Sequence, residues 1–103
     1  MIIRLSPDST PRLDEADNFR AFKIVAPAIM DRAALTNALG TLGRLDASAD
    51  THAWIDEAAL RKLANRPDDK AWHEGASAML DYARRAGFID AETGAIRAHI
   101  EPD

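Results

Sequence analysis

The chain has 103 residues, of which 47% are hydrophobic and 29% charged, the size and composition of one globular domain rather than of a disordered segment. It contains no cysteine, which excludes disulfides, thiolate metal sites and cysteine nucleophiles. Its 17 acidic and 13 basic residues give a net charge of −4, which disfavours a nucleic-acid-binding protein, because phosphate contacts dominate the affinity of such proteins.

Residues 1–30 are expected to form an extension with one or two strands. "MIIRL" has the composition of a short strand, and "FRAFKIVAP" has Phe, Ile and Val at strand spacing before Pro27. The stretch between them, "SPDSTPRLDEADN", contains two prolines and several acids and is interpreted as a loop. A helix through Leu13, Ala16 and Phe19 is the alternative.

Neither a signal peptide nor a membrane span is expected. Arg4 and Pro7 interrupt the N-terminal stretch too early for the apolar run of a signal peptide. The longest apolar stretch, "IVAPAIM", is far shorter than the ~20 residues that cross a bilayer. We therefore expect a cytoplasmic protein without membrane contact.

Three helices are predicted after residue 30. The first begins after Asp31, whose carboxylate can cap it, and its apolar repeat ends at Gly43. "THAWI" then alternates like a short strand, and Asp56 caps a second helix that stops at "NRP". Asp68 or Asp69 caps the third helix, whose apolar residues form one stripe wide enough to face a core: Trp72, Ala76, Met79, Leu80, Ala83 and Ala86.

A glycine stop and a hairpin follow the third helix. Gly87 supplies the left-handed residue of a helix end, after which Phe88 can fold back on Ala83. "FID", the turn "AETG" and "AIRAHIE" then indicate two antiparallel strands. This order of helix, strand, helix, helix and hairpin over residues 31–101, with its ending "ARRAGFIDAETGAIRAHIE", resembles the winged-helix domain.

The resemblance implies an α+β fold of three helices with a small antiparallel sheet, in which the "THAWI" strand pairs with the last strand. Residues 1–103 would form a single domain, with 1–30 outside the winged-helix-like core of residues 31–101. In DNA-reading members of that superfamily, the exposed side of the third helix contacts DNA. The positions that correspond to this face, or lie beside it, are Lys70, His73, Ser77, Arg84 and Arg97.

Acidic residues on that face favour a different function. The first turns of the third helix contain Asp68, Asp69 and Glu74. The turn of the following hairpin, which corresponds to the wing of a winged-helix domain, reads "DAETG" and is acidic as well. Both segments would repel phosphate. Our first hypothesis is therefore a small non-enzymatic module that docks a protein partner or forms a homodimer. A DNA-binding transcription regulator is the alternative.

A third hypothesis concerns the histidines. His52 and His99 lie on two strands that the resemblance pairs, so they could be adjacent, with Glu101 near, in a pH-sensitive or metal-like cluster of a small ligand- or metal-binding protein. The alternative is that the two histidines are half-exposed surface residues of the sheet without a shared function. "WHEGASA" begins like a zinc-protease helix, but Ser77 stands where the second histidine is needed. We predict no catalytic residue, no metal site and no cofactor.

Overall fold

The computed structural model describes residues 1–103 and contains three α-helices, a 3-10 turn and six strands. The strands are β1 (Ile2–Ser6), β2 (Ser9–Asp14), β3 (Lys23–Ala26), β4 (Gly43–Asp46), β5 (Ala49–Ile55) and β6 (Ile96–Pro102). The helices are α1 (Arg32–Leu39), α2 (Glu57–Ala64) and α3 (Lys70–Arg85), and the 3-10 turn η1 (Gly40–Leu42) follows α1. The α+β class agrees with the sequence expectation, but the sheet does not.

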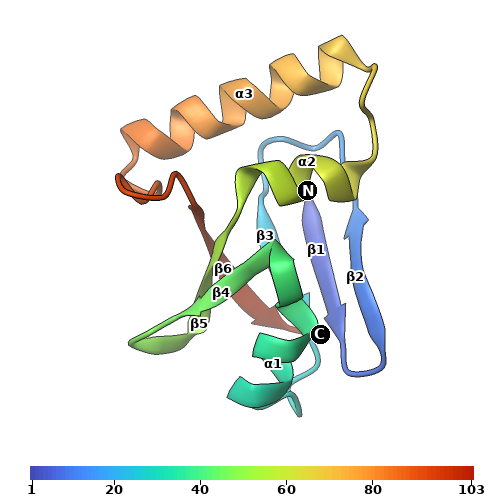
Figure 1. Ribbon diagram of the computed structural model, residues 1–103, viewed down its shortest axis with the longest axis vertical. Coiled ribbons are helices and arrows are strands. Elements are labelled where there is room, and N and C mark those ends of the chain that lie inside the picture. The colour runs from blue at the N-terminus through green and yellow to red at the C-terminus, as the bar shows by residue number, and fades with distance from the viewer.

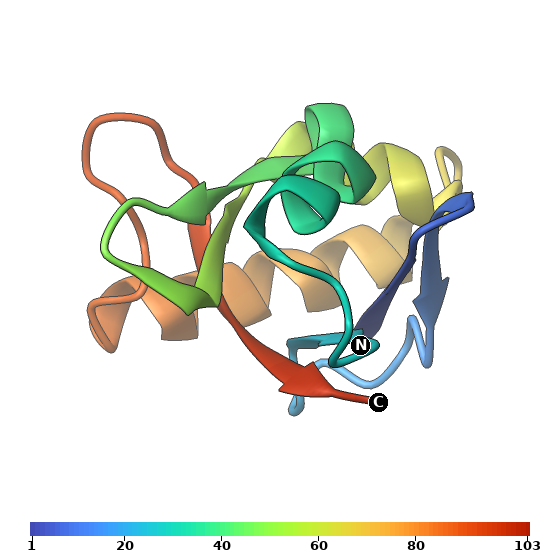
Figure 2. The ribbon, with the colours of Figure 1, turned by 90° about the horizontal axis from the view of Figure 1, so that it is seen from below.

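All six strands form one mixed, strongly curled sheet in the order β2-β1-β3-β6-β5-β4 (Figures 1 and 2). β1, β3 and β6 run parallel, while β1–β2, β5–β6 and β4–β5 are antiparallel. In Figure 1, α3 crosses one end of the sheet and α1 lies at the other. The expected small antiparallel sheet is therefore wrong.

The error arises from strands that local patterns hide. β2 lies within the stretch that was interpreted as a loop. Its Pro11 suggested a break in regular structure, but β2 is an edge strand, where a proline is tolerated although it has no backbone N–H to donate. β4 has only four residues, "GRLD", and resembles a turn. Residues 1–30 contribute three strands, and β3 pairs with the last strand at Ile24 and Ile100. Such parallel pairing between distant segments leaves no local signature.

The third helix itself is confirmed, but of the six residues predicted for its buried stripe Met79 is only half-buried and Ala86 is exposed. α3 buries Trp72, Ala76, Leu80 and Ala83, and the Asp69 carboxylate accepts a hydrogen bond from the Trp72 amide at 3.0 Å. After it, Gly87 has a φ of +85°, and the Phe88 amide donates to the Ala83 carbonyl at 2.8 Å. This is the hydrogen bond of a Schellman stop. The expected hairpin beyond it is minimal, with one bridge between Ile89 and Ile96.

A single core lies between the helices and one face of the sheet. Its 19 buried residues come from every strand except β2, from the three helices and η1, and from Met1 and Met30 outside these elements. On β5 and β6, Ala53, Ile55, Ile96 and Ala98 are buried. Because side chains alternate along a strand, the residues between them lie on the opposite, outer face: His52, Trp54, Arg97 and His99. None of the helices has the length and apolar character to cross a bilayer.

Candidate ligand-binding cleft

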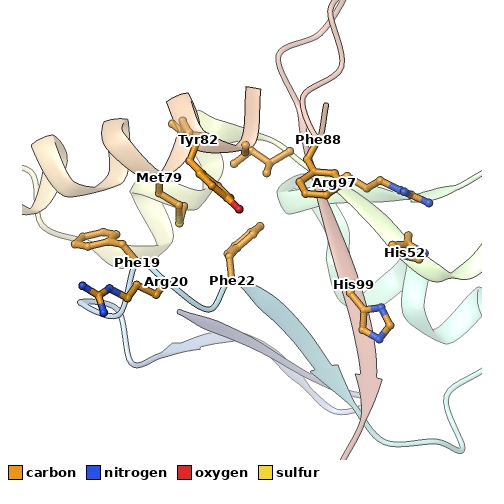
Figure 3. A pocket seen from close by; sticks show the side chains of 12 residues that line it. Phe19, Arg20, Phe22, His52, Met79, Tyr82, Phe88, Arg97 and His99 are labelled. Carbon is orange, nitrogen blue, oxygen red and sulfur yellow. The ribbon is translucent and has the colours of Figure 1, made fainter. Parts of the chain in front are cut away.

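A cleft opens where the sheet has a gap. β6 pairs with β3 only from Ile100 onward, and the bridge to the preceding segment ends at Ile96. Between these points the β3 side of β6 has no neighbouring strand, and the C-terminal half of α3 lies above it (Figure 3). The cleft encloses about 270 Å³ and is lined by Phe19, Arg20, Phe22, His52, Met79, Leu80, Tyr82, Ala83, Phe88, Ile96, Arg97 and His99.

Aromatic side chains form one side of this cleft. Figure 3 shows Phe19, Met79, Tyr82 and Phe22 grouped below α3, with Phe88 nearer to β6. Tyr82 is 64% exposed and Phe88 43% exposed, the largest exposures among the aromatic residues that line it. Large apolar side chains left open around a concave surface are characteristic of binding sites.

Phe19 and Phe22 are held in place by the segment between β2 and β3. The Trp72 indole N–H donates to the Ala16 carbonyl at 2.9 Å, and the Phe19 ring lies 6.0 Å from the Trp72 ring. Phe19 also packs directly on Gly75 of α3, where a Cβ would overlap its ring. This side of the cleft is therefore built on a buried anchor rather than on a free loop.

Two histidines and an arginine border the other side. His52 lies opposite His99 in the β5–β6 register, and their rings meet edge to face with centroids 5.2 Å apart. The Arg97 amide donates to the Phe88 carbonyl and so points away from β5. His99, two residues on, has the same orientation, so His52 and His99 form a non-hydrogen-bonded pair, in which side chains approach most closely. The structure thus brings together the two histidines singled out in the sequence.

Glu101 does not join the histidine pair. Its carboxylate accepts a hydrogen bond from the Lys23 ammonium at 3.3 Å instead. No group of three or more His, Cys, Asp or Glu side chains in the chain has the arrangement of a metal site. The imidazole pair therefore lacks the third protein ligand of a typical zinc centre.

The His52 ring is in an environment that opposes its protonation. Loss of hydration lowers its pKa below the usual 6.5, and the nearby positive charge of Arg97 and the His99 ring lower it further. Asp46 acts in the opposite direction. The Asp46 carboxylate accepts hydrogen bonds from the Ser48 amide and hydroxyl, which lower the pKa of Asp46 and keep it charged.

The other residues proposed from the sequence are dispersed. His73 and Ser77 both face α2, where the Arg61 guanidinium donates to His73 Nδ1 at 2.9 Å and to Ser77 Oγ at 3.0 Å. His73 Nε2 lies 2.7 Å from the Arg66 carbonyl. A carbonyl only accepts, so Nε2 carries the proton and Nδ1 accepts from Arg61. His73 and Ser77 therefore connect two helices.

Lys70 and Arg84 lie on the exposed side of α3, away from this network. Lys70 is 3.9 Å from Glu74, and Arg84 is 2.9 Å from Asp81. Arg84 donates a hydrogen bond to the Asp81 carboxylate, an arrangement that does not favour phosphate contacts, whereas Lys70 makes no hydrogen bond to Glu74 and its side chain is 90% exposed. Of the five residues proposed for an interaction face, Arg97 is the one that lines the cleft.

The aromatic side of the cleft was not predicted as a site. Met79 was placed in the buried stripe of the third helix, and Tyr82 flanks that stripe. Their exposure depends on the gap between β3 and β6, which no local pattern indicates. The clustering of aromatic residues before β3 was the one available signal.

Comparison with known proteins gives no relative. No protein-family model, no curated protein and no solved structure matches the chain.

Proposed function

We propose that the protein binds a small molecule with an apolar, ring-containing body in the cleft between α3 and β6. The observation behind the proposal is the gap in the sheet, which leaves a concave surface lined by Phe19, Phe22, Met79, Tyr82 and Phe88. A binding protein of this kind needs no catalytic group.

The size of the cleft supports a ligand of modest dimensions. An apolar cavity of about 150 Å³ holds a benzene molecule. At about 270 Å³, the cleft has room for a two-ring group or a branched chain of similar volume. It lies near the lower end of the volumes that ligand pockets have.

A titration with 2-naphthalenemethanol, an uncharged two-ring probe, followed by ¹H–¹⁵N NMR, tests this function. We expect shifts of the amide signals of Phe22, Phe88 and His99, and saturable binding. Met79→Trp places a large ring in the cleft and should reduce the affinity about tenfold or more. Ala78→Trp adds the same ring at an exposed position next to it, outside the cleft, and should leave the affinity unchanged. Absence of binding by the unaltered protein would reject the function.

A second candidate function is the formation of a homodimer through the same apolar surface, and Tyr82 and Phe88 favour it. Both side chains are exposed and line the same cleft (Figure 3). A symmetric dimer would cover them with the same patch of a second copy. Analytical ultracentrifugation over a range of concentrations tests this: a dimer that Tyr82→Ser weakens supports it, whereas a monomer at every concentration contradicts it.

A further inference from the structure

The charged groups around the cleft indicate what kind of ligand it takes, an inference that rests on the proposed function. The chain has 17 acidic residues, yet none of the 12 residues that line the cleft is a carboxylate. The ionisable groups there are Arg20, Arg97, His52, His99 and the Tyr82 phenol. The chain as a whole has a net charge of −4, so a cleft lined by basic groups and no acidic ones has the opposite sign of charge from the rest of the protein.

Arg97 differs from most arginines of the chain. Seven others, Arg4, Arg12, Arg32, Arg44, Arg61, Arg66 and Arg84, donate a hydrogen bond to a carboxylate. The Arg97 side chain is 38% exposed and forms an ion pair with Asp46, with Nε and Oδ2 3.9 Å apart, but its guanidinium makes no hydrogen bond within the chain. It therefore retains donors for a ligand, and a guanidinium can bind a carboxylate through two parallel hydrogen bonds.

We propose that the ligand is a small organic acid whose apolar body lies against the aromatic side of the cleft and whose carboxylate is bound by Arg97 beside the His52–His99 pair. Figure 3 shows two groups of side chains: Phe19, Phe22, Met79 and Tyr82 lie below α3, while Phe88, Arg97, His52 and His99 lie around β6, with the Arg97 guanidinium pointing away from the first group. A neutral ligand would use only the first of these two groups.

The histidine pair makes the affinity for an anion depend on pH. Each imidazole can add a positive charge beside the ligand's carboxylate. The charged groups that face the pair are Arg97 on β6 and Asp46 on β4, while Lys23 on β3 and Glu101 on β6 neutralise each other. Hydrogen bonds from Ser48 lower the pKa of Asp46, so its carboxylate stays charged over the range in which histidines titrate. The affinity for an anion should therefore increase as the pH falls from about 8 to about 5.5.

The test compares 2-naphthoate with 2-naphthalenemethanol, which share a ring system and differ in charge. We expect 2-naphthoate to bind the unaltered protein about tenfold more tightly or better. Arg97→Gln should remove this preference while leaving the affinity for the neutral alcohol unchanged, which also shows that the variant is folded. Arg44→Gln is the matched control: it removes the same charge from the same face, outside the cleft, and should keep the preference.

The pH dependence is measured with naphthalene-2-sulfonate, which stays ionised throughout. Its affinity should rise by about threefold between about pH 8 and pH 5.5, and this rise should be lost in the His52→Gln, His99→Gln double variant. Equal affinities for naphthoate and the alcohol, or a preference that survives Arg97→Gln, overturn the acid specificity but leave the proposed function intact. If neither probe binds, both the function and the specificity fail.

Discussion

At the scale of single residues, Gly43 lies where the neighbouring backbone leaves no room for a side chain. A Cβ at this position would overlap the carbonyl oxygen of Trp54 on the adjacent strand. Gly75 on α3 is also closely approached, but by the ring of Phe19, which can move. The two glycines should therefore respond differently to the same substitution.

Gly43→Ala should lower the free energy of unfolding by about 1–3 kcal/mol, because the β4–β5 pair must separate to accept the methyl group. Gly75→Ala should cost less, because alanine is favoured over glycine within a helix by about 1 kcal/mol and a ring can rotate more easily than a strand can shift. Urea unfolding of both variants measures the difference. Equal losses would show that the Phe19 ring is as immobile as the β5 backbone.

The residues of the cleft show what single-residue reasoning can and cannot provide. The adjacency of His52 and His99 could be proposed from the sequence because both lie on segments with strand character that the winged-helix resemblance pairs. The partners of Phe19 and Phe22 could not, because these depend on a helix that starts about 50 residues later. A side chain's chemistry is local, whereas its surroundings are set by the fold.

At the scale of elements, α3 is the helix whose limits follow most directly from residue types. Asp69 caps its start, and Gly87, with a φ of +85°, ends it. The apolar period of 3.6 residues between them needs no knowledge of the sheet. β2 and β4 are the opposite case, since an edge strand with a proline and a four-residue strand carry too little pattern to be distinguished from turns.

Gly87→Ala should lower the free energy of unfolding by about 1–2 kcal/mol, because a Cβ clashes with the neighbouring carbonyl in the left-handed region. Gly87→Asn should recover part of this loss, because asparagine tolerates that conformation. Thermal and urea unfolding of the two variants provide the comparison. A Gly87→Ala protein as stable as the unaltered one would contradict the Schellman stop.

At the scale of the whole molecule, ion pairs connect segments that are distant in sequence. Arg66, between α2 and α3, donates two hydrogen bonds to Asp17, at 2.8 and 2.9 Å, and Arg4 on β1 bonds Asp14 on β2. The hydrogen bond from Arg66 lowers the pKa of Asp17, and the one from Arg4 lowers the pKa of Asp14, both below the usual 3.8. These pairs make stability depend on pH.

We expect the free energy of unfolding to fall as the pH drops through about 3.8 and below, in addition to any loss near pH 6.5 from His52, whose pKa is lower in the folded chain. The unfolded chain has the higher carboxyl pKa values, so it takes up protons first, and acid therefore favours unfolding. Urea unfolding between about pH 7 and pH 3 measures this dependence, which Asp17→Asn should weaken. A stability that does not change over this range would contradict the pairing.

The sheet order is the part of the fold that sequence patterns could not supply. The α+β class, the three helices and the β5–β6 pair follow from residues that are close together or from a known order of elements. The parallel pairs β1–β3 and β3–β6 bring together residues that are far apart in the sequence, such as Ile24 and Ile100. No local sequence pattern indicates a contact of this kind. The cleft exists because β3 and β6 overlap only in part, so it could not be predicted either.

The position of β6 has a consequence for the continuity of the sheet. Although β6 follows every other element in the chain, it lies inside the sheet, between β3 and β5. Without β6, the strands β1–β2–β3 and β4–β5 would be two separate pieces, each with an uncovered edge. Residues 96–102 alone connect the two pieces into one sheet, and the cleft lies along this connecting strand.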